Sequence, residues 1–64
     1  MLVNGEEFPL DGPVSIKAFL ERQGYQVDRV AVQKNGEIIS RFVYEQEMLT
    51  QDDRLEIVSF VGGG

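Results

Sequence analysis

The chain has 64 residues, of which 11 are acidic and six basic, and it contains neither cysteine nor histidine. This length allows one small domain, without room for both a large substrate cavity and a full catalytic scaffold. The net charge of −5 argues against nucleic acid and anionic membranes as partners and favours a partner with a basic surface. The missing residue types exclude disulfides, zinc sites built on Cys and His, and acid–base steps that rely on imidazole.

Short apolar runs and the lack of a signal segment lead us to expect a soluble, cytoplasmic protein.

The first elements predicted are two strands. Residues 1–4 form the first strand, and Asn4-Gly5 is a strong hairpin-turn signal. Phe8 and Leu10 alternate with polar or turn residues as a second strand, which lies at a sheet edge because Pro9 has no N–H to donate.

A short amphipathic helix follows. The stretch 16–23 has apolar residues at helical spacing, so that Phe19 and Leu20 share one face with the first residue of the stretch. Ser15 can cap the first turn, and Gly24 supplies the left-handed stop.

The second half of the chain is predicted to be mostly strand. Residues 30–34 and 37–40 form a hairpin around a second Asn-Gly turn at Asn35. Residues 41–53 are less regular, and Tyr44, Met48 and Leu49 could form an apolar stripe on a short helical turn.

Residues 54–61 form the last strand. Its alternation places Leu55, Ile57, Ser59 and Val61 on one face, with Glu56, Val58 and Phe60 on the other.

This order of elements predicts an α+β fold of the ubiquitin-like β-grasp type. The sheet is mixed, with about five strands and one main helix packed on one face. The first and last strands pair in parallel at its centre, and the other face stays wet. We expect residues 1–61 to form the β-grasp domain and residues 62–64 a flexible glycine tail.

No group of side chains has the pattern of a catalytic or metal site. Paired carboxylates at Glu6-Glu7 and Asp52-Asp53 are typical of solvated turns and surfaces. The three final glycines do not form a phosphate loop, because no helix follows them.

The remaining candidate is the α-carboxylate of Gly64, which activation by ATP would turn into an acyl donor. Gly62 and Gly63 have no Cβ, so the tail can thread a narrow channel of a partner. An inert frayed terminus or a cloning remnant is the alternative.

The whole chain resembles the ThiS family of bacterial sulfur carriers in thiamine (thiazole) biosynthesis. The resemblance rests on Val3-Asn4-Gly5, the helix 16–20, the hairpin 30–41, and the closing strand with its glycine end. At Ser40, Tyr44 and Asp52 the chain departs from residues that the family often has. These departures leave open a sister carrier for tRNA thiolation or molybdopterin.

The resemblance implies a specific chemistry. An E1-like enzyme adenylates Gly64 with ATP, sulfur from a desulfurase or persulfide protein replaces AMP, and the resulting thiocarboxylate donates sulfur to thiazole synthase. The chain is then a substrate rather than an enzyme, and it holds no cofactor of its own. A ubiquitin-like binding module with an inert tail is the alternative from another class.

Val58 and Phe60 are the expected docking residues for the adenylating enzyme. They alternate away from the predicted core, and an exposed aromatic side chain beside the tail suits a partner pocket. The alternative is that Phe60 packs on its own sheet neighbours.

Overall fold

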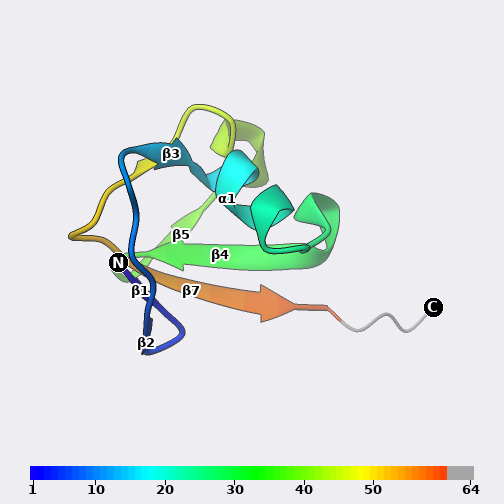
Figure 1. The fold of residues 1–64 in the computed structure, drawn as a ribbon. Helices are drawn as coiled ribbons and strands as arrows, with labels where there is room; N and C mark the ends of the chain where they lie inside the picture. Colours follow the sequence, from blue (N-terminus) through cyan, green and yellow to red (C-terminus); the bar gives the residue numbers. More distant parts are fainter. Residues whose placement is uncertain (61–64) are drawn as a thin grey trace.

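The computed structural model describes residues 1–60 and contains one α-helix, two 3-10 turns and seven short strands (Figure 1). The helical elements are α1 (Ile16–Arg22), η1 (Val27–Arg29) and η2 (Arg41–Val43). The strands are β1 (Leu2–Val3), β2 (Glu6–Glu7), β3 (Val14–Ser15), β4 (Val30–Lys34), β5 (Glu37–Ile39), β6 (Met48–Leu49) and β7 (Arg54–Ser59).

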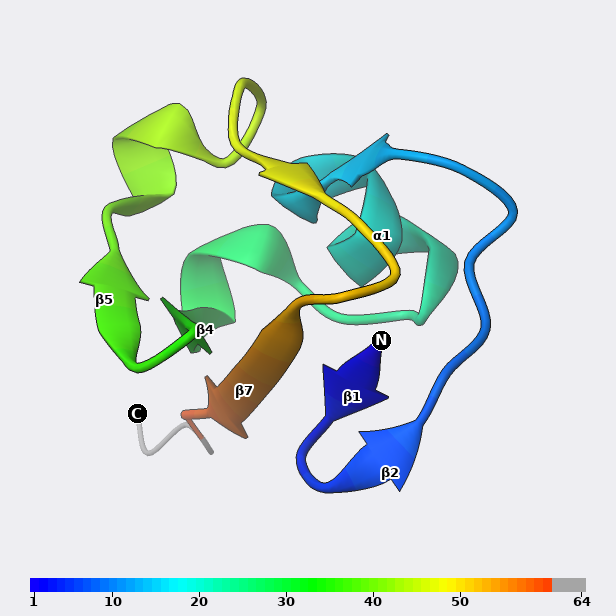
Figure 2. The same cartoon turned by 90° about the vertical axis from the view of Figure 1, so that its left-hand side faces the viewer.

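Five strands form one mixed sheet in the order β2-β1-β7-β4-β5. β1 and β7 are parallel, with Leu2 opposite Arg54 and Val3 opposite Leu55, whereas the other pairs are antiparallel. The predicted parallel pairing of the first and last strands at the sheet centre is therefore confirmed. Figure 2 shows α1 on one side of this sheet, and within residues 1–60 no helix covers the other side.

The helix forms where its caps and apolar spacing predict it. The Ser15 hydroxyl oxygen accepts a hydrogen bond from the Ala18 N–H at 3.0 Å, which satisfies one of the free donors of the first turn. Gly24 has a φ of +85°, a left-handed conformation that lets the chain reverse after the last turn. Within the described residues no helix is long and apolar enough to cross a membrane.

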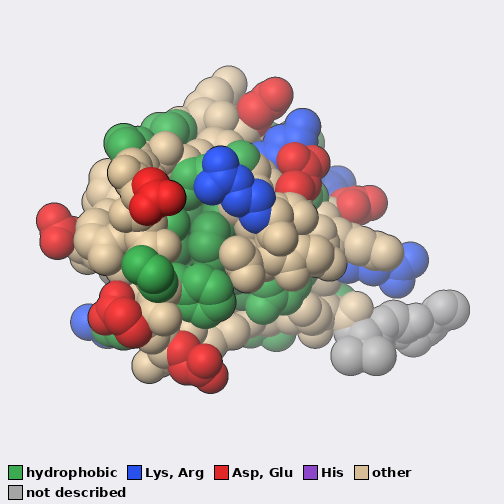
Figure 3. All heavy atoms as spheres, in the orientation of Figure 1, with side chains coloured by type: hydrophobic (Ala, Val, Ile, Leu, Met, Phe, Trp, Pro, Cys, Tyr) green, Lys and Arg blue, Asp and Glu red, His purple; other side chains and the backbone are tan. Residues whose placement is uncertain are grey.

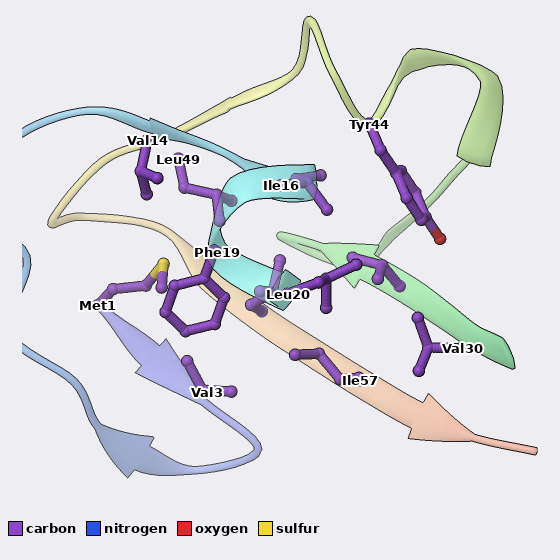
Figure 4. Packing of buried hydrophobic residues seen from close by; sticks show 12 residues of the cluster. Met1, Val3, Val14, Ile16, Phe19, Leu20, Val30, Tyr44, Leu49 and Ile57 are labelled. Carbon is purple, nitrogen blue, oxygen red and sulfur yellow. The ribbon is translucent and has the colours of Figure 1, made fainter. Parts of the chain in front are cut away.

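The core lies between α1 and the sheet, and long-range contacts from both ends of the chain build it (Figure 4). Its buried members are Met1, Val3, Val14, Ile16, Phe19, Leu20, Val30, Val32, Tyr44, Leu49, Leu55 and Ile57. Phe8 is partly buried and packs edge-to-face on Phe19, with ring centroids 5.9 Å apart.

The second predicted strand is wrong in its bounds. β2 ends at Glu7, and the amide of Phe8 makes one more hydrogen bond, to the carbonyl of Met1 at 2.7 Å. The chain leaves the sheet at the next residue because Pro9 has no N–H to continue the ladder. The amide of Leu10 is bonded instead to the side chain of Gln51 at 2.7 Å.

The predicted helical turn carrying Tyr44, Met48 and Leu49 is also wrong. Only Tyr44 borders a helical turn, as the residue that follows η2, and its side chain is buried. Met48 and Leu49 form β6, which pairs antiparallel with β3 in a second sheet. Leu49 is buried and Met48 is half exposed, which is the alternation of a strand.

Candidate functional site

The site is built around the end of β7, the strand that leads toward the predicted glycine tail. β7 is the central strand of the sheet, with β1 along one edge and β4 along the other. Residues 61–64 lie outside the described part of the chain, so the predicted roles of Gly62, Gly63 and Gly64 stay predictions. What the structure shows is how the strand before them is held.

On the β4 side, β7 is paired along its whole length. The register runs from Lys34 opposite Leu55 to Val30 opposite Ser59. One more hydrogen bond, from the Phe60 N–H to the Arg29 carbonyl at 2.8 Å, extends this ladder past the end of the strand. The base of the tail is therefore anchored to the rest of the sheet as far as Phe60.

On the β1 side, the side chain of Asn4 forms the hydrogen bonds to β7 that follow the end of β1. Its Oδ1 accepts a hydrogen bond from the Ile57 N–H at 2.8 Å, and its Nδ2 donates one to the Ile57 carbonyl at 3.2 Å. The backbone of Asn4 is left-handed, with a φ of +51°, which asparagine tolerates better than most residues. The side-chain amide thus copies a peptide group and extends the ladder by one position while the chain itself turns away. The sequence predicted the turn at Asn4 but carried no signal for this contact.

The second Asn-Gly turn holds the beginning of β7. Asn35 Oδ1 accepts a hydrogen bond from the Arg54 N–H at 2.9 Å, and Asn35 Nδ2 donates one to Asp53 Oδ1 at 2.9 Å. Asp53 Oδ2 in turn accepts a hydrogen bond from the Thr50 N–H at 2.8 Å. Lys34 completes the cluster, with its Nζ 2.8 Å from Glu47 Oε2 and 4.0 Å from Asp53 Oδ2.

These contacts shift two titrations. Burial alone would raise the pKa of Asp53, but the hydrogen bonds from Asn35 and Thr50 outweigh it and leave this pKa below its ordinary value. The hydrogen bond to Glu47 is the main cause that raises the pKa of Lys34, with Asp53 adding attraction. Both groups are therefore charged at neutral pH and serve to join the β4–β5 turn to the loop before β7.

The sheet face opposite α1 carries the two predicted docking residues. Val58 and Phe60 are each 59% exposed. Leu55 and Ile57, which alternate toward the core, are buried. The predicted alternation of β7 is therefore confirmed at these positions. Ser59 differs: it is on the core-facing side by alternation, yet it is exposed.

Other exposed apolar side chains were not predicted. Ile38, on the outer face of β5, is 79% exposed, and Phe42, on η2, is 85% exposed. The signal for Ile38 was present, because alternation in the predicted strand 37–40 turns Ile38 and Ile39 to opposite faces of the sheet. Phe42 carried no such signal, since a three-residue 3-10 turn has no long-range periodicity.

The charged groups of the described chain do not converge on one point. Within residues 1–60 no three His, Cys, Asp or Glu residues are placed to hold a metal ion. Figure 3 shows acidic side chains spread around one face, with apolar side chains between them. The arrangement offers an apolar surface next to an anchored strand end, which is suited to contact with another protein.

The comparisons with known proteins decide the family. The family model described as "ThiS family" matches residues 1–64 of the chain. The chain belongs to the ThiS family. The crystal structure of the thiamine biosynthesis protein (ThiS) from Geobacter metallireducens superposes with a TM-score of 0.81 at 29% identity, covering 98% of this chain and 96% of that one. The ubiquitin-like β-grasp fold predicted from the order of elements is confirmed.

Two proteins similar to this chain are named thiazole synthase. The one from Paramagnetospirillum magneticum is 38% identical over all 64 residues, and the one from Magnetococcus marinus is 34% identical over 62 residues. The chain spans only about a fifth of the length of these relatives, 20% and 19% respectively.

Proposed function

We propose that this chain is a sulfur carrier of thiamine biosynthesis that works through the carboxyl group of Gly64. Membership of the ThiS family supports the sulfur-carrier role in this pathway. The observation that carries the proposal is that this family match extends over residues 1–64, and that the central strand of the sheet, which ends at Ser59, is followed in the sequence by Phe60, Val61 and three glycines.

The proposed chemistry takes place in two transfers. The Gly64 carboxylate attacks the α-phosphorus of ATP in an E1-like adenylating enzyme, and pyrophosphate leaves. The terminal sulfur of a persulfide then attacks the acyl carbon, and AMP leaves. A thiol of the sulfur donor cleaves the S–S bond, so that the donor is oxidised to a disulfide and Gly64 keeps the sulfur as a thiocarboxylate. The carrier is thus the substrate of these steps.

The glycines suit this role for a steric reason. Three residues in extended conformation reach roughly 10 Å, and without a Cβ they can enter a channel too narrow for any side chain. The anchored pairing of β7 up to Phe60 supports the idea that the folded domain serves as a rigid base for this extension.

We propose that Val58 and Phe60 dock the adenylating enzyme. Both side chains are exposed on the outer face of β7, beside the start of the tail. Burying an exposed aromatic ring at the centre of an interface is a common source of binding energy. The net charge of −5 favours a basic surface on the enzyme around this apolar contact.

Thiazole synthase is the proposed acceptor of the sulfur. The two relatives with that name contain a segment similar to nearly the whole of this chain within a much longer polypeptide. A carrier segment joined covalently to a thiazole synthase supports a direct contact between the two activities. Carriers for tRNA thiolation or molybdopterin have no such support here.

Mass spectrometry of the intact protein tests the proposal. The chain is incubated with ATP, cysteine, a cysteine desulfurase and the adenylating enzyme, and we expect it to gain the mass difference between sulfur and oxygen. A fragment lacking Gly63 and Gly64 is the control and should gain nothing.

The same truncated chain separates the carrier from a binding module. If the truncated chain supports sulfur transfer as well as the full chain, or if the full chain gains no sulfur during turnover, the tail has no chemical role. A module with an inert tail would also keep its full function after the truncation.

A further inference from the structure

Within residues 1–60 the edge of β7 that faces β1 is paired over only part of its length. Along β7 the hydrogen-bonding groups of alternate residues point to opposite edges of the strand. The Arg54 carbonyl and the Phe60 N–H bond to the β4 side, at Asn35 and Arg29. The odd-numbered residues 55, 57 and 59 therefore direct their N–H and C=O groups to the β1 side.

Among the described residues, the hydrogen-bonding partners on the β1 side end before β7 does. The backbone of Asn4 donates to the Leu55 carbonyl at 2.9 Å, and its side chain satisfies both main-chain groups of Ile57. Within residues 1–60 β1 pairs with β7 only at Arg54 and Leu55. Figure 1 shows β7 continuing past the β1–β2 hairpin with β4 along one side only. The next main-chain groups on the uncovered edge are those of Ser59.

The surroundings of Ser59 suit an added strand. The residue is exposed although its position alternates toward the core. Side chains of a strand running along this edge would alternate between the helix-side face of the sheet and the outer face that carries Val58.

We propose that the main-chain N–H and C=O of Ser59 pair with an extended segment of the adenylating enzyme, which continues the sheet where β1 ends. This proposal rests on the proposed function. Main-chain pairing recognises a strand without regard to its side chains, and it would align the glycine tail with the channel that follows. The edge is continuous with the exposed Val58 and Phe60, so one partner can contact both. A second copy of the chain is a poorer occupant, because both copies carry a net charge of −5.

Ser59→Pro and Ser59→Ala form a matched pair for the test. Proline removes the N–H and places its ring on the open edge, where a strand tolerates it, whereas alanine keeps the N–H and removes only the hydroxyl. We expect Ser59→Pro to raise the Kd for the adenylating enzyme by about tenfold, the equivalent of one main-chain hydrogen bond, and Ser59→Ala to bind as the wild type. Equal binding by the two variants would overturn the proposal.

Two further measurements keep the test decisive. If Ser59→Pro fails to fold, a synthetic chain with an ester in place of the amide at Ser59 removes the same donor without a ring, and it should show the same loss of affinity. Hydrogen exchange of the Ser59 amide should be fast in the free wild type and protected in the complex, and an amide that stays fast when bound contradicts the pairing. A wild-type dimer that Ser59→Pro dissociates would assign the edge to a second copy instead.

The wild-type mass gain separates this proposal from the proposed function. If the wild type gains sulfur and Ser59→Pro binds like Ser59→Ala, the pairing is wrong and the carrier role stands. If the wild type gains no sulfur, the carrier role is wrong, and the pairing with this enzyme falls with it.

Discussion

At the residue scale, two asparagines with the same backbone conformation hold the two halves of β7. Asn4 and Asn35 both have a positive φ and both precede a glycine with a positive φ. Their side chains then bond to different parts of the same strand, Asn4 at Ile57 and Asn35 at Arg54. Turn chemistry explains why asparagine occurs at these positions, and the side-chain contacts explain why glycine would serve less well.

Asp53 should contribute to stability in a pH-dependent way. Replacing it with alanine removes the acceptor for the Thr50 amide and the partner of Asn35, and we expect the free energy of unfolding at pH 7 to fall by about 1–3 kcal/mol. The pKa of Asp53 is lowered by folding, so its contribution is complete above the ordinary value of 3.8 and is lost as the pH falls through the lowered value. Urea unfolding of wild type and Asp53→Ala between pH 7 and pH 2 measures this difference.

The neighbouring carboxylate provides the control for that measurement. Asp52 is exposed and has no hydrogen bond or ion pair within the described residues. Asp52→Ala should therefore unfold at nearly the wild-type urea concentration. A difference between wild type and Asp53→Ala that stays constant down to the lowest pH would contradict the assigned role.

At the element scale, local signals placed α1, β4, β5 and β7, but they failed for β3 and β6. The helix and the longer strands have several residues of regular periodicity and clear caps or turns. β3 and β6 have two residues each and pair with each other across more than half the chain. A two-residue strand has no periodicity to detect, so only the partner defines it.

The cap at Ser15 should be needed for α1. Ser15→Ala leaves the Ala18 amide without its acceptor, and we expect a loss of about 1 kcal/mol in the free energy of unfolding, measured by urea titration. Ser40→Ala is the matched control, because the Ser40 hydroxyl accepts only the exposed amide of Phe42 at the start of a three-residue turn. If the two variants lose the same stability, the cap is not a significant contribution to α1.

At the scale of the whole molecule, α1 covers one face of the sheet, and within residues 1–60 no helix covers the other. This division places Phe19 in the core at 2% exposure and Phe60 at the surface at 59%. Burial of a phenylalanine side chain contributes roughly 1.5–3 kcal/mol, so the two rings should respond differently to truncation.

Phe60→Ala tests this division together with the docking proposal. We expect the variant to melt near the wild-type temperature and to bind the adenylating enzyme several-fold more weakly, as measured by isothermal titration calorimetry. Phe42→Ala removes another exposed ring from η2 and should bind as the wild type. Unfolding of Phe60→Ala, or unchanged binding, would show that Phe60 has no docking role.

The order of the main elements, the β-grasp fold, the helix with its caps and the outward alternation of Val58 and Phe60 could be predicted from the sequence alone. The elements, the caps and the alternation depend on spacing or turn chemistry within a few neighbouring residues, and the fold follows from the order of those elements. The tertiary structure alone decided the β3–β6 pair and the contacts of Asn4 and Asn35 with β7. These features join residues far apart in the chain, and no local pattern records which distant strand or amide a residue will meet.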